Sequence, residues 1–106
     1  EEHPPGTLVH NARRAEEAGF AFASISDHYH PWVRAQGHSP FVWAVLGGIA
    51  QATSRIGVGV GVSCPILRIH PAVVAHAAAT TSLGVGRPGL VDLGCNDRTA
   101  GSVRHR

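Results

Sequence analysis

Charged and aromatic residues are scarce in this chain, at 15% and 6% of its 106 residues. The basic residues Arg98, Arg104 and Arg106 gather at the end like a solvated tail, and no basic stretch alternates with aromatic residues that would stack on bases. We therefore expect no nucleic-acid partner. Cysteine is also rare. Cys64 and Cys95 lie far apart and form no C-x-x-C pair, which predicts reduced thiols, with a single disulfide as the alternative.

Signals for membranes and export are missing from the printed sequence too. No apolar run is long enough to cross a bilayer, and the opening Glu1-Glu2-His3-Pro4-Pro5 is unlike a signal peptide. We therefore expect no membrane association and a cytoplasmic location. The composition that remains is globular, because hydrophobic residues make up 43% of the chain. The length allows one domain at most.

Helical and extended patterns alternate along the chain, which indicates βαβ units and a parallel sheet. A few parallel strands are not a finished fold, and a (β/α)₈ barrel needs about 250 residues, so we expect a piece of a larger architecture. On the first helix, Arg13, Arg14, Glu16 and Glu17 are expected to face water. The predicted helices cover residues 7–19, a segment opening at Ser39-Pro40, and 72–82. The predicted strands cover residues 20–26, 55–62 and, less regularly, 90–94.

The two main strands differ in pattern. Residues 20–26 are nearly all apolar, so we expect both faces of this strand to be covered, as in a parallel sheet. In residues 55–62, branched apolar side chains alternate with Gly57, Gly59 and Gly61. These glycines lie inside a strand rather than in a turn that opens a helix, so they do not form a phosphate-binding loop. Their face leaves room for a neighbouring side chain or a ligand ring.

Reactive side chains crowd the end of the first strand, in Asp27-His28-Tyr29-His30-Pro31-Trp32. Sites in parallel α/β folds gather at the carboxyl ends of strands. Imidazole titrates near neutral pH, so His28 is a candidate general base for a hydroxyl proton. Neighbouring strand residues point to opposite faces, so we expect Asp27 to meet another part of a ligand or a backbone amide. A capping aspartate beside a solvent-exposed histidine fits the pattern equally well.

A metal site is the main alternative at this position. His28 and His30 would share a face of an extended segment, and His38 follows. No set of residues has the spacing of a closed metal site, so we favour loop histidines without a metal. At the end of the second strand, Cys64 has no activating partner in the sequence, which argues against a nucleophile.

Several motifs together resemble the luciferase-like family of (β/α)₈ flavin and deazaflavin oxidoreductases. The resemblance covers about residues 1–82. Its nearest branch is the coenzyme F420-dependent dehydrogenases, which includes enzymes that oxidise glucose 6-phosphate. The motifs are Ala15-Glu16-Glu17-Ala18-Gly19-Phe20, Ser26-Asp27-His28-Tyr29-His30-Pro31-Trp32, Ser39-Pro40-Phe41, Arg55-Ile56-Gly57-Val58-Gly59, Ser63-Cys64-Pro65 and Arg68-Ile69-His70-Pro71-Ala72.

The resemblance implies a role for each matching residue. His28 stands at the position of the family's base, and Trp32 at that of a tryptophan proposed to stabilise the intermediate. Asp27 matches a residue that lines the deazaflavin pocket. Gly61-Val62 matches a non-prolyl cis peptide against the central ring, and Cys64 lies where a small polar residue approaches the cofactor. The implied reaction is hydride transfer between an alcohol-type small molecule and F420, with FMN as the alternative cofactor, in a full-length protein expected to be a homodimer.

The sequence also departs from the family. The family's first strand would precede Glu1, and its acidic glutamate has only Asp97 as a poor substitute. We therefore expect residues 1–82 to be about three βα units from the N-terminal half of the barrel, and 83–106 to be a divergent, frayed tail from a truncated or frame-shifted reading. Such a fragment is predicted to be inactive alone. The other hypotheses are a metal-dependent hydrolase using His28 and His30, and a non-catalytic remnant that self-associates.

Overall fold

The computed structural model describes residues 2–63, 68–85 and 89–93. Helices and strands alternate along these residues, as predicted. None of the described helices is long and apolar enough to cross a membrane. The elements are α1 (Pro5–Glu17), β1 (Phe22–Ile25), the 3₁₀ helix η1 (Arg34–Gln36), α2 (Val42–Ala52), β2 (Gly57–Ser63), α3 (Pro71–Val85) and β3 (Gly89–Leu93).

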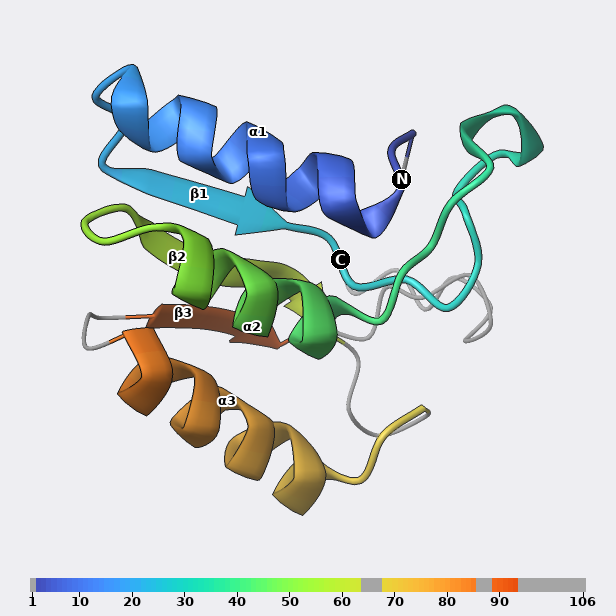
Figure 1. The fold of residues 1–106 in the computed structure, drawn as a ribbon. Coiled ribbons are helices and arrows are strands. Elements are labelled where there is room, and N and C mark those ends of the chain that lie inside the picture. The colour runs from blue at the N-terminus through green and yellow to red at the C-terminus, as the bar shows by residue number, and fades with distance from the viewer. Residues whose placement is uncertain (1, 64–67, 86–88, 94–106) are drawn as a thin grey trace, which may run out of the picture.

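The three strands form one parallel sheet in the order β1-β2-β3. Phe22 pairs with Gly57 and Ile25 with Val60, so β1 and β2 are parallel and their carboxyl ends lie at the same end of the sheet. Figure 1 shows the arrowheads of all three strands pointing the same way, with the long loop between β1 and α2 leaving from that end. The carboxyl ends of β1 and β2 therefore lie together, as the predicted site requires.

The core lies between the helices and one face of the sheet. It joins α1, α2 and α3 to β2, and α2 lies across β2 in Figure 1. Each large aliphatic side chain buried there contributes roughly 1.5–3 kcal/mol of transfer free energy. The fully buried members are Val42, Ile56 and Val60.

The opposite face of the sheet has no covering element among the described residues. Phe22 is 43% exposed and Ser24 is exposed, so the prediction that both faces of this strand are covered is wrong here. The glycines of β2 make room for these β1 side chains. A Cβ on Gly57 would lie 2.9 Å from Cδ2 of Phe22, and one on Gly61 would lie 3.1 Å from Oγ of Ser24.

Several element boundaries differ from the predictions. Strand β1 is shorter than 20–26, and α3 continues past residue 82 to Val85. Helix α2 begins at Val42 after Phe41, and no side chain caps it. The Ser39 hydroxyl instead donates to the carbonyl oxygen of His28. The predicted stop after α1 is confirmed, because Gly19 has a φ of 89°, in the left-handed region that suits glycine.

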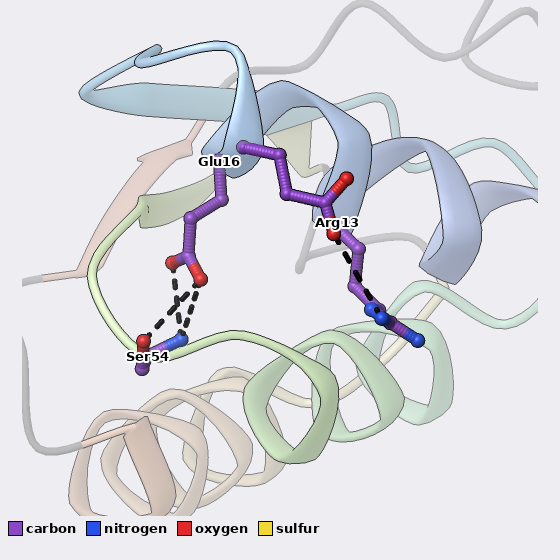
Figure 2. Close-up of polar contacts among 4 residues, drawn as sticks. Arg13, Glu16 and Ser54 are labelled. Atoms are coloured by element: carbon purple, nitrogen blue, oxygen red, sulfur yellow. Dashed lines mark hydrogen bonds and ion pairs between the residues drawn. The ribbon is translucent and has the colours of Figure 1, made fainter.

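Glu16 contradicts the expectation that it faces only water. Its carboxylate accepts hydrogen bonds from the backbone N–H groups of Ser54 at 3.0 Å, Arg55 at 2.5 Å and Ile56 at 2.8 Å. Figure 2 shows it reaching from α1 to the segment that leads into β2. The hydrogen bonds from Ile56 and Arg55 lower the pKa of Glu16 to about 2. One side chain therefore fixes the entry to β2 against α1.

Candidate active site

Asp27 and Ser63 bring the ends of β1 and β2 together. Asp27 follows β1 by two residues, Ser63 is the last residue of β2, and they are 3% and 1% exposed. The Ser63 hydroxyl donates to Oδ2 of Asp27 at 2.5 Å. The guanidinium of Arg68 donates from Nη2 to Oδ1 and forms an ion pair with the same carboxylate. Both oxygens of Asp27 therefore have partners.

This arrangement explains how a carboxylate can be buried at the strand ends. A buried charge is costly unless it is paired and hydrogen-bonded. The side chain of Arg68 is only 17% exposed and supplies the opposite charge. However, Nη1 of Arg68 is buried without a hydrogen-bond partner among the described residues. The cluster is electrically balanced but retains one unused donor.

The structure adds two partners to the environment predicted for Asp27. We expected a backbone amide or part of a ligand to meet it, and its carboxylate accepts hydrogen bonds from the side chains of Ser63 and Arg68. The reason is that the parallel register places the end of β2 beside Asp27, so Ser63 reaches it directly. Reasoning from the residues alone missed this pairing. The available signal was an arginine isolated in the apolar run Ile66-Leu67-Arg68-Ile69, where a charge needs a partner.

His28 and Trp32 lie together in the loop that follows β1. Their ring centroids are 5.3 Å apart, with planes inclined by 32°. His28 is half-buried, while Trp32 is 44% exposed. The hydrogen bond from Ser39 to the backbone of His28 ties the start of this loop to the segment before α2. The two residues predicted as catalytic are thus adjacent in space, next to the Asp27 cluster in sequence.

His30 does not join His28 around a common centre. It is exposed, and its ring packs edge-on against Tyr29 with centroids 4.5 Å apart. Over residues 2–63 and 68–82, no group of three or more His, Cys, Asp or Glu side chains is arranged to hold a metal ion. The geometry therefore gives no support to the metal-dependent alternative.

The end of β2 contains the predicted cis peptide bond between Gly61 and Val62. The pairing of β2 with β3 shifts register between Gly61 and Ser63, so the backbone departs from regular strand geometry there. Gly61 and Val62 are both half-buried. The remaining predicted cofactor residue, Cys64, lies outside the described residues. The edge thus combines an irregular backbone, a buried ion pair and an imidazole beside an indole.

Comparison with known proteins agrees with this architecture. Residues 1–89 match the family described as luciferase-like monooxygenase. The chain is 49% identical over 87 residues to the F420-dependent hydroxymycolic acid dehydrogenase of Mycobacterium tuberculosis. This match covers 82% of this chain and 24% of that protein. It is 40% identical over 94 residues to the F420-dependent glucose-6-phosphate dehydrogenase of Kribbella flavida, and this match covers 89% of this chain and 28% of that protein.

A solved structure is similar as well. An F420-dependent secondary alcohol dehydrogenase in complex with an F420-acetone adduct superimposes with a TM-score of 0.84 at 34% identity, over 89% of this chain and 28% of that one. The chain therefore spans about a quarter of the length of the relatives it matches. It belongs to the luciferase-like monooxygenase family and forms part of that family's (β/α)₈ barrel.

Proposed function

We propose that the protein containing this chain is a coenzyme F420-dependent dehydrogenase that oxidises an alcohol-type substrate. The observation that carries the proposal is that the His28–Trp32 pair and the Gly61-Val62 peptide follow the carboxyl ends of two neighbouring parallel strands. The named relatives support the cofactor, since they are F420-dependent and none is named for FMN. Acetone is the oxidation product of a secondary alcohol, which supports the substrate class.

The Gly61-Val62 peptide is where a flat deazaflavin ring would lie. Phe22 and Ser24 fill the space beside Gly57 and Gly61, whereas the peptide between Gly61 and Val62 is only half-buried and departs from regular strand geometry. Asp27, Gly61, Val62 and Cys64 are the residues that would hold the cofactor. When bound, F420 supplies the acceptor for a hydride, which no side chain of this chain can provide.

His28 provides the proton acceptor for the reaction. Oxidising an alcohol to a ketone removes a hydride from carbon and a proton from the hydroxyl group. A neutral imidazole can take that proton at its free ring nitrogen if it lies within hydrogen-bond reach. The Trp32 ring near His28 can exclude water and stabilise the positive charge that the imidazole gains. Ser39 holds the backbone of His28 in place.

The test is His28→Ala in the full-length protein. Hydride transfer to F420 should fall by about 10²–10⁴-fold, the usual contribution of a general base, while the affinity for F420 stays within a few-fold. His30→Ala is the matched control, because this exposed histidine of the same loop packs against Tyr29 rather than against His28, and the variant should keep its activity. Full turnover in His28→Ala would overturn the assignment of the base.

Further features of the full-length protein belong to this proposal. We expect a homodimer that acts on a small molecule, without nucleic-acid or membrane partners, in the cytoplasm. We also expect residues 1–82 to behave as the barrel unit and the 106 residues alone to be inactive, since a quarter of the relatives' length provides only part of a site.

A further inference from the structure

We infer that Arg68 is a cofactor-binding residue whose Nη1 group donates a hydrogen bond to a neutral carbonyl oxygen of the bound deazaflavin ring. This inference rests on the proposed function. It assigns to Arg68 a contact with ligand that is distinct from its ion pair with Asp27.

The contacts of Asp27 position the guanidinium of Arg68. Nη2 is fixed by Oδ1 of Asp27, whose other oxygen accepts from Ser63, the last residue of β2. The guanidinium is planar and rigid, so fixing one nitrogen also fixes the direction of the other. Nη1 therefore lies at the strand ends, next to the residue that precedes His28.

The Nη1 group of Arg68 is a buried donor that lacks an acceptor among the described residues. Buried polar groups are nearly always hydrogen-bonded, and each exception calls for a group that completes it. A donor left unused at the edge where the cofactor is proposed to bind points to an acceptor on that cofactor.

Charge selects the kind of acceptor. The carboxylate of Asp27 already balances the positive charge of Arg68. A phosphate at Nη1 would therefore add a net negative charge to a buried site, at a cost in desolvation. A neutral carbonyl oxygen adds none. Deazaflavin has such oxygens on its pyrimidine ring, whereas its phosphate lies on the side chain of the cofactor.

The test separates binding from stability in the full-length protein. Arg68→Lys keeps a cation for Asp27 but lacks the rigid second nitrogen. We expect its melting temperature without ligand to stay close to the native value and its Kd for F420 to rise about 10- to 100-fold, as for loss of one charge-assisted hydrogen bond. Arg55→Lys is the control, since the exposed Arg55 precedes the start of β2, at the end opposite to Ser63, and its Kd should not change.

A second variant guards against a folding defect. Asp27→Asn/Arg68→Met removes both charges together, so no buried ion remains unpaired. It should fold, and it should bind F420 at least as weakly as Arg68→Lys, because Asp27 is itself among the residues proposed to hold the cofactor. A deazaflavin that carries only its ribityl arm should show the same rise in Kd in Arg68→Lys, because the proposed contact is to the ring. Unchanged affinity in Arg68→Lys, or a loss seen only with the phosphate-bearing cofactor, would overturn the inference. A native protein that fails to bind F420 would instead overturn the proposed function.

Discussion

At the scale of single residues, Glu16 is the clearest structural determinant. Three consecutive backbone N–H groups, at Ser54, Arg55 and Ile56, donate to its carboxylate. We expect Glu16→Gln to lower the melting temperature at neutral pH more than Glu17→Gln does. Glu17 forms an exposed ion pair with Arg13 at 3.8 Å, so its replacement is a matched control. Equal melting temperatures for the two variants would show that the contact contributes no stability.

The pH dependence of this contact follows from the lowered pKa. Folding lowers the pKa of Glu16 from 4.5 to about 2, so the folded state favours the ionised carboxylate. Its contribution is fully present above pH 4.5 and is lost as the pH falls toward about 2. The difference in melting temperature between the native chain and Glu16→Gln should therefore shrink across that window. A difference that stays constant to the acid end of the window would contradict the assignment.

The Asp27 cluster makes a second prediction at this scale. Asp27→Ala leaves the buried guanidinium of Arg68 without its counter-charge, and breaking a buried pair in this way costs about 3–5 kcal/mol. Ser63→Ala removes one hydrogen bond and should cost about 1 kcal/mol. Ser26→Ala, at an exposed position beside the cluster, should cost less than about 0.5 kcal/mol. Denaturant unfolding measures all three, and Asp27→Ala equal to Ser26→Ala would exclude a buried ion pair.

At the scale of elements, two neighbouring glycines in α2 form a natural comparison. A Cβ on Gly47 would meet nothing within 4 Å, whereas one on Gly48 would lie 3.0 Å from Cγ2 of Val9 in α1. Alanine at either position gains about 1 kcal/mol of helix propensity. We expect Gly47→Ala to keep that gain and Gly48→Ala to lose it to crowding between the helices. Thermal melts of the two variants test this, and equal stabilisation would mean that α1 packs more loosely against α2.

The sequence predicted the elements better than their contacts. Apolar spacing indicated every main helix and strand because that spacing is a local property, and β3 falls within one residue of its predicted range. Ser39 was predicted on local grounds to open the second helix, yet its hydroxyl bonds to His28, eleven residues earlier. Glu16 likewise bonds to residues about 40 positions away. Partners this distant in sequence depend on how the helices and strands pack, which a pattern of neighbouring residues does not contain.

At the scale of the whole molecule, one face of the sheet has no layer over it among the described residues. Phe22 on that face is 43% exposed. An exposed apolar face next to unpaired strand edges favours association. We expect the 106-residue chain to self-associate, and Phe22→Ser to reduce the association seen by light scattering. Val73→Ser is the control, because Val73 lies in α3 and is 53% exposed. A larger effect of Val73→Ser would assign the association to the helices.

The candidate site was predictable in part at this scale. The position of His28 and Trp32 at a strand end followed from the order of strands and helices, and the structure has the two rings side by side. The cis peptide at Gly61-Val62 came from the family resemblance and is present. The pairing of Asp27 with Arg68 joins residues 41 positions apart. It arises from the parallel alignment of β1 with β2, so only a folded chain reveals it.

The most direct test is a titration of the full-length protein with F420. Binding is measured as a change in melting temperature, and activity is measured as hydride transfer from a secondary alcohol. A ligand that binds only the folded state stabilises it by about 2.7 kcal/mol at 100 times its Kd. We predict a stabilisation of this size in the native protein and in His28→Ala, with hydride transfer lost only in the variant. A native protein whose melting temperature does not respond to F420 would contradict the account.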